Sequence, residues 1–396
     1  MRIVHVITGL GFGGAESSLC SLIEESQLRN RTLKHIVVSI LSGGPLRLRL
    51  EQAGARVIEL SGTRGAAGLL AMRRLASTIA QQNPDIVHAW MYHANVATAV
   101  LRRFRYFKCP LVWSIRQSID DPTLDRRLTR AIIKFGARIS SSTDLIVYNS
   151  YDSALTHIAR GYSASRYTVI HNGINCDRFR PRLGAGATLR SQLGLPPDAL
   201  LVGRIARYAP MKDFATLIIA FAKVRSSIPH ACLLLVGDGI EGNNELQSLC
   251  STNGVLDHIR IINPRLDIEM IYPALDVMVS SSRSNEGFPN VVGEALASGT
   301  LVAASASGDS GLIQGAHEVV PPQDSQALAQ AIIKLGRLDA DEKSLHASKG
   351  RNFIVKNFSL QQCYESHCEL YYSLALQRPI DDGSSSDVRS GSIKST

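Results

Sequence analysis

The chain has 396 residues, of which 45% are apolar and 19% are charged, and its formal net charge is +9. This composition is typical of a globular protein, and the length exceeds what one hydrophobic core usually serves, so two domains are expected. No apolar run approaches the roughly 18 residues that span a bilayer, and the first residues lack a signal-peptide pattern, so a cytoplasmic protein is expected. The seven cysteines are scattered without a C-x-x-C pair, which argues against a disulfide framework and against a zinc site.

Short β-branched runs alternate with longer helical patterns along the first 170 residues. The predicted strands are 3–7, 35–41, 56–60, 85–88, 111–114, 145–148 and 168–170, and the helical segments between them include 16–27, 45–53, 69–82 and 94–102. Such alternation is typical of βαβ units and predicts a doubly wound parallel sheet. Prolines and glycines gather between residues 177 and 197, where a domain boundary is expected.

The alternation resumes after this boundary, with predicted strands at 200–205, 232–236, 259–262, 277–281, 301–304 and 318–320. We therefore predict an α/β protein of two Rossmann-like domains, residues 1–178 and 199–360, that face each other across a cleft. In such sheets ligands bind beyond the carboxyl ends of the strands, so the functional residues are expected in the loops that follow strands. The tail, 379–396, has no apolar periodicity and is expected to be disordered.

A glycine-rich loop follows the first predicted strand and reads GLGFGGAE over residues 9–16. Gly9, Gly11 and Gly14 match the G-x-G-x-x-G spacing, in which glycines let the backbone approach a phosphate at a helix N-terminus. An NAD site also needs an acidic residue after the second strand to hold the ribose. Residues 39–44 contain none, so another phosphate ligand is favoured over NAD.

The basic excess lies entirely in the first half of the chain. Residues 1–180 hold 24 Lys and Arg against 12 Asp and Glu, whereas the remainder holds 19 against 22. Two clusters stand out, namely Arg102, Arg103, Arg105 and Lys108, and, at helical spacing, Arg126, Arg127, Arg130, Lys134 and Arg138. Two interpretations stay open, a solvated helix face and contact with an anionic membrane surface or a lipid phosphate. Nucleic acid is disfavoured because no recognised nucleic-acid-binding module accompanies the cations.

Two cations follow the first strand of the second domain. Arg207 and Lys212 lie five residues apart in a loop between a predicted strand and a predicted helix. They can converge on one diphosphate, the arginine as a bidentate donor and the lysine as a point charge, and neutralise charge on a departing phosphate. The alternative is an ordinary exposed pair of basic residues.

Two glutamates flank the start of a predicted helix in the segment SSSRSNEGFPNVVGEALASG, residues 280–299. Glu286 lies in the loop before this helix, and Glu294 lies on its first turns. Carboxylates accept hydrogen bonds from vicinal sugar hydroxyls, although a carboxylate pair could also be the acid and base of a hydrolase. The chain has one D-x-D sequence, Asp339-Ala340-Asp341, in a polar segment far from these motifs. We interpret it as a solvated turn or helix start, and we expect no metal.

Taken together, these motifs resemble the GT-B retaining glycosyltransferases of family 4, which build bacterial surface polysaccharides and lipopolysaccharides. The resemblance rests on Gly13-Gly14, on Arg207 with Lys212, and on Glu286 with Glu294. It also includes His171-Asn172-Gly173-Ile174 and the stretch LLVGDG at 234–239, and it runs from Ile3 to about residue 372. It implies the GT-B fold, with a C-terminal helix at about 361–376 that packs back on the first domain.

The resemblance also implies roles for individual residues. Arg207, Lys212, Glu286 and His93 are the implied catalytic residues. The implied donor-binding residues are Gly13, Gly14, Arg207, Lys212, Gly237, Arg265, Glu286, Gly287, Phe288, Pro289, Asn290, Val291 and Glu294. Within this set, Glu286 would face the transferred sugar, Glu294 would hold the nucleotide ribose, and Gly237 would line the base pocket with Arg265 nearby.

The acceptor side is expected in the first domain, at His88, Tyr92 and Arg116. His88 is predicted to follow a strand and His93 to begin a helix, so both would face the cleft, although each could equally be a structural hydrogen-bonding group. Arg116 could equally be an ordinary loop arginine. Two positions depart from the family pattern: Asp213 stands where many relatives have glycine, and Gly293 stands where a bulkier apolar residue is common.

The resemblance therefore implies a retaining, metal-independent glycosyltransferase without a cofactor. It would move a hexose or N-acetylhexosamine from a nucleotide diphosphate sugar, with UDP favoured over GDP, to a hydroxyl of a lipid-linked or glycan acceptor in cell-surface polysaccharide synthesis. The inner face of the membrane is a plausible location for such a basic first domain, and no nucleic-acid partner is expected. Two alternatives stay open, an epimerase of UDP-N-acetylhexosamine and a nucleotide-sugar-binding subunit without turnover.

Overall fold

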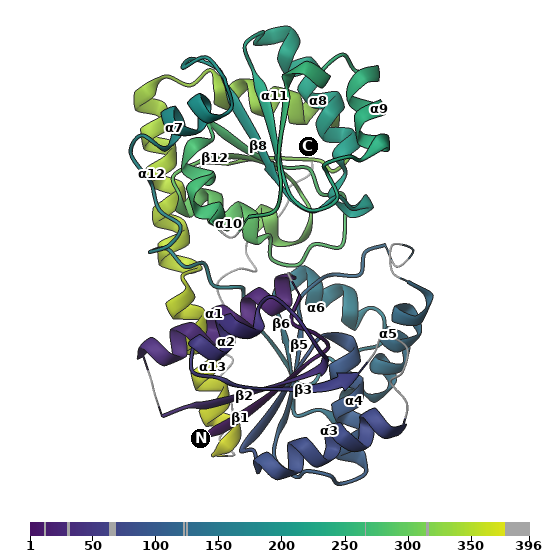
Figure 1. Ribbon diagram of the computed structural model, residues 1–396. Helices are drawn as coiled ribbons and strands as arrows, with labels where there is room; N and C mark the ends of the chain where they lie inside the picture. Colours follow the sequence, from purple (N-terminus) through teal and green to yellow (C-terminus); the bar gives the residue numbers. More distant parts are fainter. Residues whose placement is uncertain are drawn as a thin grey trace, which may run out of the picture.

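The protein is described by a computed structural model that covers residues 1–11, 13–29, 32–62, 69–121, 123, 126–265, 267–313 and 317–376. Figure 1 shows two domains, the N-terminal one below and the C-terminal one above, each a sheet flanked by helices. The tail expected to be disordered, 379–396, lies outside the described residues.

The N-terminal domain is built on a parallel sheet with the strand order β3-β2-β1-β4-β5-β6-β7. Its strands are β1 (Arg2–Ile7), β2 (Lys34–Leu41), β3 (Arg56–Gly62), β4 (Ile86–Trp90), β5 (Leu111–Ile115), β6 (Leu145–Tyr148) and β7 (Tyr167–Val169). Its helices are α1 (Gly14–Arg29), α2 (Arg47–Gln52), α3 (Leu69–Gln82), α4 (Met91–Arg103), α5 (Arg127–Ile139) and α6 (Tyr151–Ile158). The order reverses between β1 and β4, and such a switch point opens a crevice at the carboxyl ends of the strands.

The C-terminal domain repeats this plan with the order β10-β9-β8-β11-β12-β13, again with parallel pairing. Its strands are β8 (Leu201–Ile205), β9 (Cys232–Val236), β10 (Ile259–Ile262), β11 (Val277–Ser280), β12 (Leu301–Ser305) and β13 (His317–Val320). Its helices are α7 (Ala185–Gln192), α8 (Phe214–Ser227), α9 (Asn244–Thr252), α10 (Asn290–Ala297), α11 (Ser325–Gly336) and α12 (Ala340–Asn357). The predicted pair of doubly wound α/β domains is thereby confirmed.

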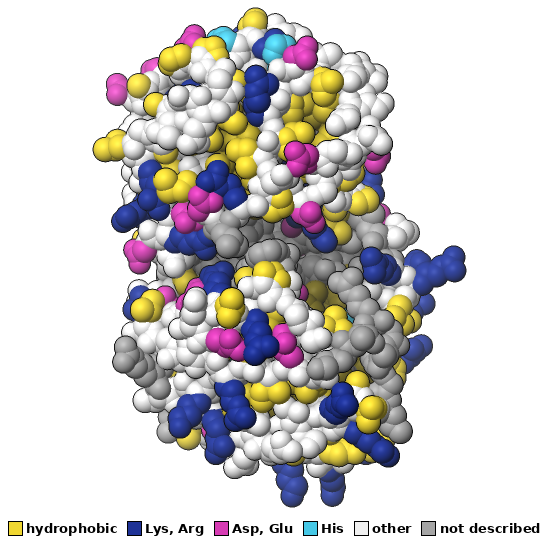
Figure 2. Space-filling view, viewed as in Figure 1, with side chains coloured by type: hydrophobic (Ala, Val, Ile, Leu, Met, Phe, Trp, Pro, Cys, Tyr) yellow, Lys and Arg dark blue, Asp and Glu magenta, His cyan; other side chains and the backbone are white. Residues whose placement is uncertain are grey.

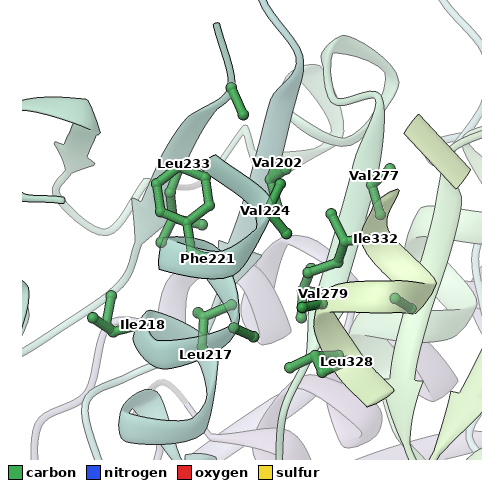
Figure 3. Packing of buried hydrophobic residues seen from close by; sticks show 14 of the residues in the cluster. Val202, Leu217, Ile218, Phe221, Val224, Leu233, Val277, Val279, Leu328 and Ile332 are labelled. Atoms are coloured by element: carbon green, nitrogen blue, oxygen red, sulfur yellow. The ribbon is translucent and has the colours of Figure 1, made fainter. Parts of the chain in front are cut away.

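Both faces of each sheet are covered by helices, which explains why the strands are runs of apolar residues without alternation. In the C-terminal domain, Figure 3 shows Phe221 and Val224 of α8 and Ile332 of α11 packed over the sheet residues Val202 and Val279. Burial of such side chains on both faces supplies most of the free energy that holds the layers together.

Helix α13 (Leu360–Ala375) joins the end of the chain to the N-terminal domain, as Figure 1 shows by the long yellow path that descends from the upper domain. Its buried side chains, Cys363, Tyr364, Leu370 and Tyr371, belong to the same core cluster as β1 and α1. Ser359 caps its first turn. The two domains are therefore linked twice, by the segment before α7 and by the passage from α12 to α13.

Four histidines are buried in the N-terminal domain at or near the contact with α13, namely His5, His35, His88 and His367. His5 Nε2 lies 3.0 Å from His35 Nδ1, and His88 Nδ1 lies 2.8 Å from the Tyr371 hydroxyl. Burial lowers the pKa of all four below the ordinary histidine value, so each imidazole is neutral near pH 7. These histidines serve the packing of the domain, not the cleft.

Candidate functional site

An ion pair between Lys212 and Glu286 lies at the centre of the candidate site. Lys212 ends a short 3₁₀ turn before α8, and its ammonium contacts the Glu286 carboxylate in the loop before α10. The Ser282 hydroxyl donates to the same carboxylate at 2.7 Å. Burial raises the pKa of Glu286, but Lys212 and Ser282 outweigh it, so the pKa lies below its ordinary value. The Glu286 carboxyl is therefore ionised, and each side chain is about a fifth exposed, 21% for Lys212 and 17% for Glu286.

Beneath this pair lies Arg204, a residue that the sequence analysis missed. It stands inside β8, is only 1% exposed, and donates to the Lys212 carbonyl and the Ser282 hydroxyl, each at 3.2 Å. Burial lowers its pKa to about 10, and Glu286 opposes that shift, so the guanidinium stays charged. Arg204 thus holds the backbone under Lys212 and the hydroxyl that bonds Glu286. An arginine inside the apolar run LVGRI was the signal that could have revealed it.

Arg207 is exposed and belongs to the same loop as Lys212. Burial raises the pKa of Glu16 on the first turn of α1, and a backbone hydrogen bond and the charge of Arg207, in the other domain, oppose that shift. Gly13 lies just before this helix, and a Cβ atom there would collide with the Glu16 carboxylate. Gly14 begins α1 and is exposed. The glycine loop and Arg207 therefore border the cleft from opposite domains.

A cavity of about 360 Å³ opens between α1 and α10. It is lined from the N-terminal domain by Ser17, Ser18, Ser21, Glu24, Leu46 and Arg49, from the C-terminal domain by Arg265, Ile268, Asn290 and Glu294, and from the linking segment by Gly173, Ile174, Asn175, Arg178 and Phe179. Helix α10 begins at Asn290 after Pro289, without a side-chain cap. The amides of Asn290 and Val291 can therefore bind an anion, whereas that of Val292 donates to the Pro289 carbonyl at 3.0 Å.

Glu294 lines this cavity, and the pKa of its carboxyl is unusual. Tyr272 donates a hydrogen bond to its carboxylate at 2.6 Å. Burial is the dominant influence and raises the pKa of Glu294 to about 7, against the opposing influence of Tyr272 and Arg178. The site therefore holds two glutamates with separated pKa values, one ionised beside Lys212 and one that titrates near neutral pH.

This separation predicts a pH dependence for nucleotide binding. Affinity for a nucleoside diphosphate is expected to fall about five- to tenfold between about pH 8 and about pH 6, because protonated Glu294 loses its acceptor for ribose hydroxyls. Calorimetric titration at both pH values measures it. The Glu294→Gln variant is the control, since it removes this titration while that of the ligand phosphate remains. An equal pH dependence in both proteins would contradict the prediction.

Several predicted donor-side residues are not among those that line the cavity. A Cβ atom on Gly237 would collide with the Ala206 carbonyl, so glycine is required where these two loops touch. A Cβ atom on Gly287 would collide with the side chain of Asn149 in the N-terminal domain. The expected contact of the Phe288 side chain with the donor is corrected by the structure. This ring is buried against His171 and Phe358, away from the cavity. Val291 packs against the core cluster that contains Phe288.

Arg265 reaches the cavity, as expected, but its guanidinium is already engaged. It donates to both oxygens of Asp267, at 2.6 and 2.5 Å. This pairing lowers the pKa of the Asp267 carboxyl to about 2. Arg265 is therefore held in place by its own loop. Its charge is neutralised by Asp267 where it lines the cavity.

The three residues expected on the acceptor side, His88, Tyr92 and Arg116, are corrected by the structure. His88 lies in the middle of β4, which extends to Trp90 instead of ending at residue 88, and α13 covers it. Arg116 is 9% exposed, with its guanidinium 5.0 Å from the centre of the Trp90 ring, and Tyr92 bonds to buried His157 at 2.9 Å. These three side chains are core residues. His93, on the first turn of α4, is only half-buried, and burial lowers its pKa.

Both departures from the family pattern have a structural reason. Asp213 adopts the left-handed conformation with φ of 47°, which explains why glycine suits this position, and its side chain caps α8 by accepting from Thr216. A Cβ atom on Gly293 would lie about 3 Å from the side chain of Ile174, so the close packing of the linking segment favours glycine there.

The D-x-D sequence and the possibility of a metal site can also be assessed from the structure. Asp339 is the N-cap of α12 and forms a capping box with Glu342, which confirms the helix-start interpretation. Among the described residues, no group of three or more His, Cys, Asp or Glu side chains is arranged to hold a metal ion. In the same part of the chain, no helix combines the length and apolarity that crossing a membrane requires.

Comparisons with known families agree with this geometry. The family model described as Glycosyltransferase Family 4 matches residues 12–178, and the model described as Glycosyl transferases group 1 matches residues 196–337. Among curated proteins, a D-inositol 3-phosphate glycosyltransferase of Streptomyces avermitilis is 32% identical over 54% of this chain and 48% of its own length. One from Corynebacterium urealyticum is 28% identical over 60% and 58%. The chain thus spans about half the length of the curated relatives it matches.

Solved structures share the whole architecture. HepE of Anabaena, solved with UDP and glucose, is 24% identical and superposes with a TM-score of 0.80 over 94% of this chain and all of its own. A sucrose-phosphate synthase of Thermosynechococcus elongatus is 20% identical, with a TM-score of 0.78 over 95% and 100%. At these identities the similarity establishes the fold, and it confirms the GT-B arrangement of two facing domains.

Proposed function

Because the chain belongs to the glycosyltransferases of group 1 and family 4, we propose that it transfers a hexosyl group from a nucleotide diphosphate sugar to an acceptor hydroxyl. The observation that carries the proposal is the Lys212–Glu286 pair beside the uncapped start of α10. Cations and free helix amides bind a diphosphate, and a carboxylate accepts hydrogen bonds from sugar hydroxyls. The diphosphate and the sugar of the donor would therefore each find a partner here.

In this proposal the diphosphate lies between Arg207, Lys212 and the first amides of α10. Departure of the nucleoside diphosphate creates negative charge, and the fixed cations stabilise it without needing a metal ion. Glu286, released from part of its pairing with Lys212 by the incoming phosphate, accepts from hydroxyls of the transferred sugar. Glu294 then lies where a ribose would fit in the cavity. Retention at the anomeric carbon is part of the proposal and follows the family resemblance.

UDP is the proposed nucleotide, and HepE, whose fold this chain shares, has been solved with UDP and with UDP-glucose. Two acceptor classes are proposed. A lipid-linked or glycan acceptor follows from the family resemblance, and a phosphorylated polyol follows from the names of the curated relatives, which act on D-inositol 3-phosphate. His93, which was predicted as a catalytic residue, lies on the first turn of α4 and remains partly exposed to either acceptor.

A nucleotide-sugar panel tests the proposal. The purified protein is incubated with UDP-, GDP- and ADP-sugars, each with D-inositol 3-phosphate, with extracted lipid-linked saccharide, or without acceptor. Acceptor-dependent release of one nucleoside diphosphate, with an α-configured product, is expected. Epimer formation without acceptor would identify an epimerase instead. Nucleotide binding without release under any condition would contradict enzymatic transfer.

A further inference from the structure

Asn285, the residue directly before Glu286, adopts a backbone conformation that few side chains accept. Its φ angle is 57°, in the left-handed region that favours glycine and asparagine. The residue is only 6% exposed, although it lies in a loop outside any helix or strand. Residues held in such sparsely populated conformations cluster at functional sites, where the surrounding contacts maintain them.

The contacts that maintain this conformation come from the N-terminal domain. The Asn285 side chain accepts a hydrogen bond from the Asp121 amide at 2.8 Å and donates one to the Asp121 carbonyl at 3.0 Å. The backbone amide of Asn285 donates to the Asp120 carboxylate at 2.9 Å. The two bonds to Asp121 engage only its backbone groups, as paired residues of neighbouring antiparallel strands do. We term these three bonds the Asn285 latch.

The N-terminal side of the latch is held by contacts within its own domain. The Gln117 carbonyl accepts from the Ser153 hydroxyl of α6 at 2.7 Å. The Ser118 hydroxyl donates at 2.6 Å to the same Asp120 oxygen that receives the Asn285 amide. The loop that follows β5 is therefore fixed in position, and it offers a firm anchor to the opposite domain.

The C-terminal side of the latch is the loop that carries Glu286. Two residues before Asn285, the Arg283 amide donates to the Met211 carbonyl at 2.9 Å, which connects this loop to the turn that ends at Lys212. Among the described residues, the hydrogen bonds of Asn285 itself all cross to the N-terminal domain. The latch therefore acts next to Glu286, and it exists only while the two domains are in contact.

The boundary between the two domains is polar around such contacts. Figure 2 shows charged side chains of both signs near this boundary on the face that it draws. Domains that meet through polar interfaces move relative to each other unless specific contacts fix them. Loss of the latch is therefore expected to free the loop around Glu286 while each domain stays folded.

We propose that Asn285 is a positioning residue for the transfer reaction, and that it acts by fastening the Glu286 loop to the N-terminal domain. The inference rests on the proposed function, in which Glu286 faces the transferred sugar. Transfer depends on the exact place of this carboxylate, because a misplacement of about 1 Å can cost on the order of a hundredfold in rate. Nucleotide binding does not depend on it, since the cations and the start of α10 that hold the diphosphate lie outside the latch.

The variant Asn285→Gly tests the proposal, because glycine keeps the left-handed backbone and the amide bond to Asp120 while both side-chain bonds disappear. It is expected to lower kcat for transfer about ten- to a hundredfold, with Kd for UDP and the melting temperature close to wild type. Steady-state kinetics and calorimetry measure this split. Asn83→Gly is the matched control, since Asn83 also has a left-handed φ, 44°, but is exposed just after α3. It should keep the wild-type kcat.

Hydrogen exchange tests the latch without requiring activity. Peptides that span Asp121 are expected to exchange faster in Asn285→Gly than in the wild type or in Asn83→Gly. Equal exchange in all three proteins would overturn the latch itself. Faster exchange with an unchanged kcat would overturn the positioning role, as would a parallel loss of kcat, UDP affinity and melting temperature, which marks a purely structural residue. If the wild type transferred no sugar, the positioning role would fall with the proposed function, whereas the exchange result would still decide whether the latch forms.

Discussion

Replacement of Lys212 by alanine is expected to lower kcat by about 10²–10³-fold, the effect of removing one fixed group that stabilises charge in a transition state. The ammonium is well placed for this role because the backbone beneath it is anchored twice. The Ser281 hydroxyl donates to the Lys212 carbonyl at 3.0 Å, and Arg204 donates to it at 3.2 Å. The substitution therefore removes a charge without loosening the loop.

The same substitution is expected to change the pH profile. Without Lys212, the buried Glu286 loses its strongest partner, and its pKa rises because burial is no longer outweighed. The acid limb of kcat/KM against pH should move to higher pH, which a purely structural role for Lys212 would not produce. Steady-state kinetics across pH measures both effects.

Lys223→Ala is the matched control for this prediction. Lys223 lies on α8, the helix that follows the Lys212 loop; it is partly exposed and donates to Gln326 at 2.7 Å. Its removal is expected to leave kcat and the pH profile unchanged. If Lys212→Ala kept wild-type kcat while retaining the wild-type melting temperature, the assigned role of Lys212 would be wrong.

Replacement of Asp309 by alanine is expected to open the cleft and lower kcat/KM by about ten- to a hundredfold. Asp309 lies in the C-terminal domain, is 3% exposed, and accepts from the Tyr151 amide at 2.9 Å and the Asp152 amide at 3.2 Å, at the start of α6 in the other domain. It also lies 2.9 Å from His171 Nε2. Hydrogen bonds to a charged group contribute about 1.5–3 kcal/mol each, so this contact is a strong link between the domains.

Asp309 also connects domain closure to the donor loop. Its amide donates to the Gly287 carbonyl at 3.1 Å, next to Glu286. On the other side of that glutamate, the side chain of Asn285 accepts from the Asp121 amide of the N-terminal domain at 2.8 Å. Closure therefore positions Glu286 from both flanks, and an opened cleft should misplace it.

Solution X-ray scattering and kinetics together test this link. Asp309→Ala is expected to increase the radius of gyration, and saturating UDP should restore part of the compact form. Asp324→Ala is the control, since Asp324 caps α11 through two backbone amides within one domain. That variant should cost about 1 kcal/mol of stability without changing the radius. An unchanged radius and kcat/KM in Asp309→Ala would contradict the prediction.

Most of the fold was predictable from the sequence because its signals are local. Parallel strands covered on both faces are continuous apolar runs, and each run from Ile3 to Val320 produced a strand close to its predicted place. The candidate donor site was predictable for a related reason. Arg207, Lys212, Glu286 and Glu294 follow strands, and the carboxyl ends of parallel strands meet at one edge, so loops distant in sequence were expected to converge.

The sequence by itself thus determined the two sheets, the family, and the loops that carry charge into the cleft. Only the tertiary structure decided how these charges pair. Lys212 and Glu286, which are 74 residues apart in sequence, form an ion pair, and Arg204 is buried beneath them. His88 was assigned to the cleft on local grounds, yet Tyr371, 283 residues away, covers it. The physical reason is the same in each case: periodicity reports which face of an element is buried, but burial, pKa and hydrogen bonding depend on which distant element covers that face.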